Sequence, residues 1–411
     1  MSEVVSLGCR LNIAESAAIR AMLSDPDLVV VNSCAVTEEA VRQTRRAIRR
    51  ARRERPSARV VVTGCAADVE RAMLTAMPEV DAVVPNGEKL EAARYRRPGD
   101  GRGPTYSSLD YAPARPGPGL RRGDRDTHAR AFIPVQNGCD HRCTFCIIPY
   151  GRGPSRSRPA GGVIDEVKRA IDGGAREVIL TGVDVTSYGD LVGDSLGLLV
   201  ERILRACPEL TRLRLSSLDP VEIDDRLLAQ IAGEPRLMPH LHLSVQAGDD
   251  LILKRMKRRH LRADAIGLVE RVKAARPEVA IGADLIAGFP TETEAMFANT
   301  LALVREAQIV FGHVFPYSPR RGTPAARMPQ LEPELIRARA GRLREACTAT
   351  HAAWLDALVG TEQRVLVELE GTTGHSENFA RVQLDGKAVP NSVRAVRILA
   401  RQGETLLGTP A

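Results

Sequence analysis

The sequence predicts an α/β protein with three folded parts: an N-terminal open parallel α/β domain, a central partial (β/α)6 barrel and a small all-β barrel at the C-terminal end. Three observations support this architecture. Residues 1–95 and 131–316 alternate short β-branched runs with helical patterns, as parallel α/β units do. A Pro- and Gly-rich stretch separates these two segments. After a long helical pattern, the chain ends in several short strand-forming runs.

The N-terminal domain, residues 1–95, is expected to form a parallel sheet with connecting helices. Its expected strands are residues 3–7, 28–31, 59–62 and 81–84. Its expected helices lie around residues 12–23, 38–53 and 68–77. Thr37 precedes the second helix and can cap its first turn. The expected buried face of that helix consists of Val41, Thr44, Ala47, Ile48 and Ala51.

Residues 96–130 form a predicted linker, because a stretch so rich in Pro and Gly does not pack. The central domain, residues 131–358, has six expected strands at residues 132–136, 178–181, 212–216, 241–245, 281–286 and 311–315, and it ends in a helical pattern over 332–358. The C-terminal domain, residues 359–411, has expected strands at 364–369, 380–384, 393–399 and 405–407. Small all-β barrels of this kind often bind RNA.

The composition of the 411 residues is that of a globular protein, with 44% hydrophobic and 27% charged residues. Aromatic residues make up only 3%, which argues against an RNA binder built mainly on stacking platforms. No apolar run approaches the ~18 residues that a membrane-spanning helix needs. The first residues do not resemble a secretory signal. We therefore expect a cytoplasmic protein.

Basic residues are concentrated in the second expected helix of the N-terminal domain. Between Val41 and Val60 there are nine arginines and one acidic residue, whereas the whole chain has a net charge of only +7. Such a stripe attracts polyanions, with nucleic acid as the leading candidate, and the alternative is a solvated helix face. The candidate RNA-binding residues, here called the arginine stripe, are Arg42, Arg45, Arg46, Arg49, Arg50, Arg52 and Arg53.

Eight cysteines in a long chain without a signal peptide do not indicate a disulfide framework. Cys207 and Cys347 stand alone in helical patterns and are expected to be buried as small apolar residues. Cys9, Cys34 and Cys65 each follow the end of an expected strand, and the carboxyl ends of parallel strands share one edge of a sheet. Three thiolates at that edge suit a soft metal or an iron–sulfur cluster, the alternative being separate burial of each cysteine.

A second cysteine group, Cys139, Cys143 and Cys146, has the spacing C-x3-C-x2-C and directly follows the first expected barrel strand. Three thiolates on a short loop can bind three irons of a 4Fe–4S cluster and leave the fourth iron open to a ligand. The alternative is zinc with His141 as a fourth ligand. Structural zinc normally takes four ligands in two pairs, and His141 lies between two of the cysteines, so we favour the iron–sulfur cluster.

These motifs resemble the methylthiotransferases of the radical S-adenosylmethionine (SAM) superfamily. Residues 136–153 carry the cysteine motif of that family. Similar stretches are residues 7–12, 31–37 and 63–66 in the family's second-cluster domain, 241–248, 287–293 and 313–319 in its barrel, and 374–379 in the tail, which resembles the RNA-binding TRAM domain. The resemblance covers nearly the whole chain outside the linker.

Residues 35–37, 139–143 and 180–189 are most similar to one branch of the family, which methylthiolates C2 of N6-threonylcarbamoyladenosine (t6A) at position 37 of tRNA. One alternative is the branch that acts on isopentenyladenosine at the same position. Another is the branch that modifies an aspartate of a ribosomal protein. The alternative outside the enzymes is an RNA-binding protein with structural metal.

The resemblance implies two 4Fe–4S clusters and SAM as cofactors, with tRNA as the partner. Cys139, Cys143 and Cys146 would hold the cluster that cleaves SAM reductively to a 5′-deoxyadenosyl radical. The other cysteine triad would hold the cluster that carries the sulfur. Radical chemistry fits the substrate, because no side-chain base removes a proton from an unactivated adenine C–H at neutral pH. No side chain is assigned a catalytic role, since the clusters carry the chemistry. The sequence identifies neither the reductant nor the sulfur donor.

Candidate contacts to SAM lie at the carboxyl ends of the expected barrel strands, where β/α barrels have their active sites. They are Thr181, Gly182, Asp184, Ser216, Ser217 and Gln246. Arg258, in a basic cluster with Arg255 and Arg259 near His260, is a further candidate that could contact a carboxylate or phosphate. The alternative for the strand-end residues is ordinary hydrogen bonding to neighbouring backbone. The basic run 152–158, which follows the cysteine motif, is expected to serve RNA or the cofactor.

Overall fold

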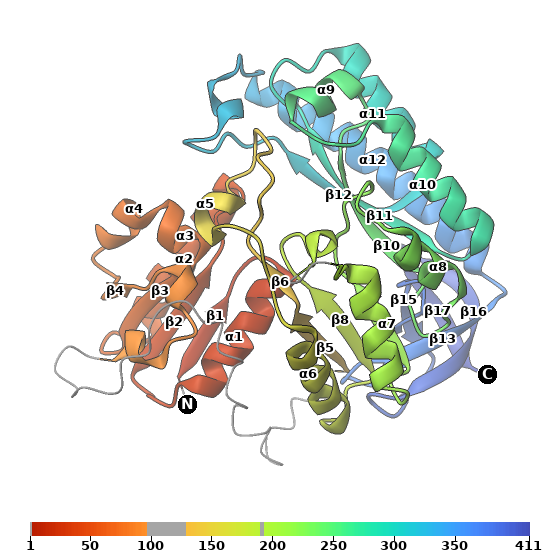
Figure 1. Ribbon diagram of the computed structural model, residues 1–411, viewed down its shortest axis with the longest axis horizontal. Coiled ribbons are helices and arrows are strands. Elements are labelled where there is room, and N and C mark those ends of the chain that lie inside the picture. The colour runs from red at the N-terminus through yellow and green to blue at the C-terminus, as the bar shows by residue number, and fades with distance from the viewer. Residues whose placement is uncertain (1, 97–128, 190–192) are drawn as a thin grey trace. The chain divides into compact units, whose positions relative to one another are not determined.

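The computed structural model describes residues 2–96, 129–189 and 193–411 (Figure 1), so most of the predicted linker lies outside the described residues. The chain forms two compact units. The first unit comprises Met1–Asp124, Gln136–Arg158 and Ser318–Ala326, and the second comprises Arg125–Val135, Pro159–Tyr317 and Arg327–Ala411. No helix within the described ranges is both long and apolar enough to cross a bilayer.

The first unit contains a four-stranded parallel sheet in the order β1-β2-β3-β4. Its strands are β1 (Glu3–Ser6), β2 (Leu28–Ser33), β3 (Arg59–Gly64) and β4 (Ala82–Val83). Its helices are α1 (Arg10–Met22), α2 (Glu38–Glu54), α3 (Cys65–Val69) and α4 (Arg71–Thr75). The valines of β2 and β3 are fully buried, as expected for parallel strands covered on both faces. The predicted open α/β domain is confirmed.

Helix α2 has the cap and the buried face that the sequence predicts. The Thr37 hydroxyl accepts a 3.1 Å hydrogen bond from the Ala40 backbone nitrogen. Val41, Thr44, Ile48 and Ala51 are buried, and Ala47 is half-buried. The single helix expected over 68–77 is wrong, because the backbone leaves the helical region at Glu70 (φ −118°, ψ 26°). At this break the Glu70 carboxylate accepts a 2.6 Å hydrogen bond from Arg320, a partner distant in sequence.

The segment that carries the second cysteine group also belongs to the first unit. Its two ends pair with each other as short antiparallel strands, β6 (Gln136–Asn137) and β7 (Arg156–Ser157). Helix α5 (Ile148–Arg152) lies within it, and a hydrogen bond of 2.9 Å from the Ala325 nitrogen to the Thr144 carbonyl attaches the stretch 318–326.

The second unit contains six parallel strands in two three-stranded sheets, β5-β8-β9 and β10-β11-β12, with an isolated parallel bridge between Leu218 and Leu243. The strands are β5 (Arg130–Pro134), β8 (Glu177–Thr181), β9 (Arg212–Leu215), β10 (His240–Gln246), β11 (Ala280–Ala287) and β12 (Ile309–Pro316). The connecting helices include α6 (Ala160–Asp172), α7 (Leu196–Ala206), α8 (Asp225–Gly233), α9 (Asp250–Arg255), α10 (Arg262–Ala275) and α11 (Glu294–Glu306). The predicted partial barrel is confirmed.

The C-terminal part of the second unit is a closed five-stranded barrel, drawn in blue and violet in Figure 1, with the order β13-β14-β15-β17-β16. Its strands are β13 (Glu362–Val367), β14 (Thr373–His375), β15 (Arg381–Leu384), β16 (Val393–Gln402) and β17 (Thr405–Pro410). Helix α12 (Pro333–Leu358) leads into it, and Leu355 completes its core. Strand β14 was missed because Thr-Gly-His is only three residues long and has glycine, which is depleted in strands, at its centre. A Cβ on Gly374 would lie 2.4 Å from the Leu366 carbonyl oxygen, so close pairing requires glycine there.

Buried charges attach this C-terminal barrel to the strands of the partial barrel. Glu177 accepts two hydrogen bonds from Arg214, at 3.1 and 3.0 Å, and pairs with Arg130 at 3.3 Å. Arg212 donates to the Arg364 carbonyl at 2.6 Å, and Arg214 stacks on the ring of Phe379. One carboxylate thus pairs with three arginines that also bind the C-terminal barrel.

Replacing Glu177 with glutamine is expected to lower the free energy of unfolding by about 3–5 kcal/mol, because it leaves buried guanidinium groups without an anion. Glu201→Gln removes a partner of the exposed Arg205 and should cost about 1 kcal/mol or less. Urea titration measures both. Equal losses for the two variants would contradict the buried-charge role.

The same carboxylate predicts a dependence of stability on pH. Burial raises the pKa of Glu177, but the charges of Arg214, Arg130 and Arg212 outweigh burial and hold the pKa below its ordinary value of 4.5. The stabilisation is therefore complete above pH 4.5 and is lost as the pH falls toward the folded-state pKa. The stability difference between wild type and Glu177→Gln should shrink across that window.

Candidate functional site

The three scattered cysteines meet at one edge of the N-terminal sheet. Cys9 precedes α1, Cys34 follows β2, and Cys65 begins α3 directly after β3. Gly8 has φ +94°, and a Cβ there would lie 2.9 Å from the Cys34 sulfur, so the Cys9 loop packs on Cys34. We call Cys9, Cys34 and Cys65 the auxiliary triad.

The donor set of the auxiliary triad fits a soft metal centre. Cys34 and Cys65 are buried and Cys9 is exposed. Burial, together with the negative charges of Cys65 and Cys9, raises the pKa of Cys34 to about 11. A free thiol at this position stays protonated at neutral pH, whereas a metal binds it as the thiolate and so compensates the burial.

The other three cysteines lie on the loop between β6 and α5, and we call them the loop triad. The Cys139 nitrogen donates to the Gly153 carbonyl at 3.1 Å, and the Cys146 nitrogen donates to the Cys143 carbonyl at 3.1 Å. Gly138 has φ +77°, and a Cβ there would come within 1.9 Å of the Pro154 carbonyl oxygen. The backbone thus folds the loop around its cysteines, which suits three thiolates on one cluster.

Helix α5 packs directly beside the auxiliary triad. A Cβ on Gly151 would lie 3.2 Å from the Cys65 carbonyl oxygen, and the Asn86 side chain donates a 2.7 Å hydrogen bond to the Gly151 carbonyl. Arg152, the last residue of the helix, has a side chain only 2% exposed. The basic run 152–158 therefore does not present its first arginine to RNA.

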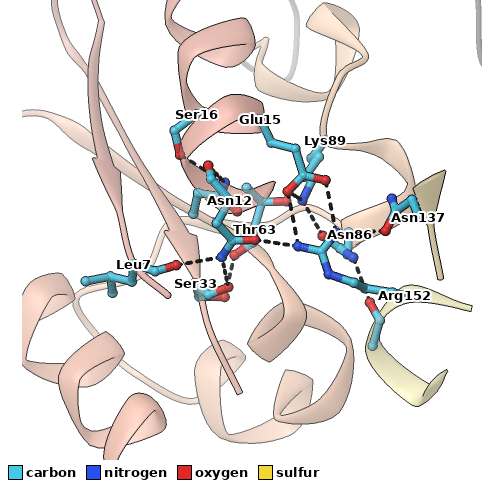
Figure 2. A network of polar contacts seen from close by, with 12 residues as sticks. Leu7, Asn12, Glu15, Ser16, Ser33, Thr63, Asn86, Lys89, Asn137 and Arg152 are labelled. Atoms are coloured by element: carbon cyan, nitrogen blue, oxygen red, sulfur yellow. Dashed lines mark hydrogen bonds and ion pairs between the residues drawn. The ribbon is translucent and has the colours of Figure 1, made fainter. Parts of the chain in front are cut away.

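Arg152 is the centre of a buried polar network, shown in Figure 2. Its guanidinium donates to the side-chain oxygens of Asn12 at 2.5 Å and Asn137 at 2.8 Å, and it pairs with Glu15 at 3.0 Å. Glu15 also forms an ion pair with Lys89. All three charged side chains are buried. The sequence analysis missed this network, although polar residues on the core face of α1, next to Cys9, were a visible signal.

Neighbouring charges outweigh burial in setting the ionisation of Glu15 and Arg152. Burial raises the pKa of Glu15, but Lys89 and Arg152 outweigh it, so the pKa lies below its ordinary value. Burial lowers the pKa of Arg152, but the negative charges of Cys65, Glu15 and Cys9 outweigh it and raise the pKa. Glu15 and Arg152 are therefore charged at neutral pH, and Arg152 lies within electrostatic range of the auxiliary triad.

In the second unit, two of the candidate SAM contacts lie in one polar network at the strand ends. Asp184 accepts a 2.7 Å hydrogen bond from the Ser187 hydroxyl. The Thr186 hydroxyl donates to Glu222 at 2.9 Å and accepts from the Asp219 nitrogen at 3.2 Å. Arg258 completes the network through Asp219 at 2.9 Å. The sequence analysis did not identify Asp219, which pairs with Arg258, or Glu222, which accepts hydrogen bonds from Thr186 and Ser187.

The remaining candidate SAM contacts lie at the ends of β8, β9 and β10. Thr181 is buried and its carbonyl accepts from Val135, while Gly182 and Ser217 are half-buried. Ser216 is buried, and within the described part of the chain its hydroxyl has no hydrogen-bond partner. Buried polar groups are normally hydrogen-bonded, so this hydroxyl suits a contact to a bound ligand. Gln246 ends β10 with φ +71°, a conformation that a non-glycine residue rarely adopts.

The sequence analysis also missed a cluster of two histidines and one aspartate on the neighbouring strands β10, β11 and β12. His242 lies 3.0 Å and His313 3.4 Å from the same Asp284 carboxylate oxygen. Burial raises the pKa of Asp284, but the hydrogen bonds from both imidazoles outweigh burial and lower it well below its usual range. Only the fold brings these three residues, one from each strand, together.

The arginine stripe projects from α2, and most of its members have surface partners. Arg42, Arg46, Arg49 and Arg50 pair with Glu39, Glu79 or Glu54. Arg52 is only 24% exposed and donates to the Ala58 carbonyl and to Asp81, so it is fixed within the domain. Arg45 and Arg53 are exposed and form no ion pair with any described residue.

Comparison with protein families yields two matches. Residues 133–304 match the profile of the radical SAM superfamily, and residues 2–85 match one described as the uncharacterized protein family UPF0004. The first match contains the loop triad, Asp184 after β8 and Arg258 after α9. The fold and the site therefore define a radical SAM enzyme.

Proteins of similar sequence show to which family within the radical SAM superfamily the chain belongs. The chain is 47% identical to the threonylcarbamoyladenosine tRNA methylthiotransferase MtaB of Rickettsia prowazekii, over 93% of this chain and 91% of that protein. It is 34% identical to the tRNA-2-methylthio-N(6)-dimethylallyladenosine synthase of Erythrobacter litoralis, over 98% and 96%. The chain belongs to the radical SAM methylthiotransferase family. The predictions of a transferase with SAM and 4Fe–4S clusters as cofactors are thereby confirmed.

A solved structure agrees with the fold. The radical SAM methyltransferase TsrM of Kitasatospora setae, with cobalamin and a 4Fe–4S cluster bound, superposes with a TM-score of 0.51 over 76% of this chain and 68% of that chain. Its sequence identity is 17%, so this likeness supports the fold alone.

Proposed function

We propose that this enzyme adds a methylthio group to C2 of t6A at position 37 of tRNA. The observation that supports this choice most strongly is the 47% identity, over 93% of the chain, to a protein named for threonylcarbamoyladenosine. Relatives named for dimethylallyladenosine are 34–35% identical. With tRNA as the substrate, the cytoplasm is the proposed location.

We assign the loop triad to the cluster that binds SAM and the auxiliary triad to the cluster that carries the sulfur. A 4Fe–4S cluster with an open iron supplies, when reduced, the electron that cleaves the sulfonium of SAM. Asp184 and Arg258 offer a carboxylate and a guanidinium at the strand ends, a pair with the charges needed to hold the amino and carboxyl groups of SAM. The orphaned Ser216 hydroxyl offers a further hydrogen bond.

The choice between branches is tested by the modified nucleosides of tRNA. Cells that lack this protein should lose 2-methylthio-t6A and accumulate t6A, and the wild-type gene should restore the product. Mass spectrometry of digested tRNA measures both nucleosides. Loss of 2-methylthio-isopentenyladenosine with unchanged 2-methylthio-t6A would assign the enzyme to the other tRNA branch.

We propose that the arginine stripe binds the tRNA backbone. Because Arg52 is fixed within the domain, the sharper variant reverses Arg45, Arg46 and Arg53 to glutamate. Each lost arginine–phosphate contact should flatten the plot of log affinity against log salt concentration by about 0.7 to 0.9. Filter binding at several salt concentrations measures this slope.

The matched control reverses three exposed arginines on the helices of the second unit, Arg271, Arg305 and Arg337. The control should retain the wild-type slope. If both triple variants give the wild-type slope, the stripe is a solvated helix face. SAM cleavage without tRNA should survive in the stripe variant, because the stripe is not part of the loop triad.

A further inference from the structure

The buried network around Arg152 places two basic side chains on one carboxylate. Arg152 and Lys89 both pair with Glu15, the one carboxylate bound to them in the described part of the chain, while Asn12 and Asn137 are neutral. Burial lowers the pKa of Lys89, and the Glu15 charge opposes this shift. The side chains of the three charged residues are between 2% and 4% exposed, so water does not compensate the excess.

The nearby carboxylate of Asp68 does not serve as a second anion for Arg152 and Lys89. Asp68 accepts a hydrogen bond from the Asn86 nitrogen at 3.0 Å, but its carboxylate also lies 3.7 Å from Arg71. That pair is balanced by itself. A buried charge without a counter-charge is costly, so the network requires another anion close by.

The auxiliary triad supplies that anion. The Cys65 thiolate acts on Arg152 and on Lys89, the Cys9 thiolate acts on Arg152, and Arg152 in turn acts on Cys34. The packing agrees, because Gly151, the residue before Arg152, lies against the backbone of Cys65.

The charge of an iron–sulfur centre at the auxiliary triad would be opposite in sign to that of Arg152. An oxidised 4Fe–4S core carries a charge of about +2, so three thiolates give the bound centre a charge of about −1. With Lys89 protonated beside Glu15, the network carries the opposite charge of one unit. Reduction, or an additional anionic sulfur ligand, makes the centre more negative, and a fixed cation favours both changes.

We propose that Arg152, with Lys89 and Glu15, is the built-in counter-charge of the auxiliary cluster and sets its reduction potential. Arg152 is thus a positioning residue, since it acts through the centre that the cysteines hold. It ends helix α5, which follows the loop triad along the chain. This inference rests on the proposed assignment of a cluster to the auxiliary triad.

The test varies the network charge in single steps. Arg152→Gln gives a neutral network in which Glu15 still pairs with Lys89, and Glu15→Gln gives a network with two positive charges. We expect the equilibrium constant for one-electron reduction of the auxiliary cluster to fall at least tenfold in Arg152→Gln and to rise in Glu15→Gln. A tenfold change corresponds to about 59 mV.

The potential is measured by redox titration followed by electron paramagnetic resonance in the full-length protein. Alanines at Cys139, Cys143 and Cys146 leave only the auxiliary cluster to titrate, and the holoenzyme is titrated for comparison. Arg152→Lys keeps the charge and should retain a potential near wild type. Arg94→Gln removes a charge from an exposed side chain of the same unit and should not shift it.

The outcomes separate the alternatives. Opposite shifts in Arg152→Gln and Glu15→Gln support the counter-charge, and so does loss of the cluster in Arg152→Gln but not in Arg152→Lys. Equal effects of Arg152→Gln and Arg152→Lys, or an unchanged potential in Arg152→Gln, overturn it in favour of a purely structural role. If the wild-type auxiliary triad holds no cluster, the proposed function fails at that point instead.

Discussion

Replacing Cys9, Cys34 and Cys65 with alanine is expected to abolish methylthio transfer while reductive cleavage of SAM continues. The reason is the division of the cysteines between two groups, of which only the loop triad is proposed to bind SAM. The variant should release 5′-deoxyadenosine under reducing conditions and form no methylthiolated tRNA. Chromatography of the cleavage products and mass spectrometry of the tRNA measure the two activities separately.

Cys207→Ala is the matched control, because Cys207 is a buried cysteine outside both triads. It should retain both activities. Loss of 5′-deoxyadenosine in the auxiliary-triad variant, with the loop-triad cluster still present by its absorbance, would show that the two centres do not divide the reaction in this way.

Replacing Cys139, Cys143 and Cys146 with alanine is expected to remove about half of the iron and all SAM cleavage. Two 4Fe–4S clusters contain about eight irons, and the auxiliary triad alone should keep about four. Iron and sulfide analysis of the anaerobically purified protein measures this loss. Complete loss of iron, or zinc in place of iron, would contradict two independently bound clusters.

Several structural elements could be predicted because the residues that determine them are close together in the sequence. The consecutive valines of β2 and β3 are typical of strands buried on both faces, and the structure buries them fully. Thr37 caps α2 through its own side chain, an interaction that spans three residues. The position of the auxiliary triad followed from topology, because Cys9, Cys34 and Cys65 each stand just after a strand of one parallel sheet.

The elements that the sequence did not reveal depend on partners far along the chain. Arg152 reads as part of a basic surface run, yet its ion-pair partner Glu15 precedes it by 137 residues and buries it. At the break in the predicted helix, Glu70 likewise pairs with a distant residue, Arg320, 250 residues later. Strand β14 forms because Leu366 and its neighbours pair with a glycine, not because its own residues favour a strand.

The grouping of residues 136–158 with the N-terminal sheet has a consequence for engineering and for recombination between relatives. In chain order this segment belongs to the barrel, so an exchange of whole domains at the linker would combine Glu15, Lys89 and the auxiliary triad from one parent with Arg152 from another. Such a chimera retains both cysteine motifs but mixes two sets of mutually fitted side chains. An exchange that preserves the fit has to transfer residues 136–158 and 318–326 together with the N-terminal sheet.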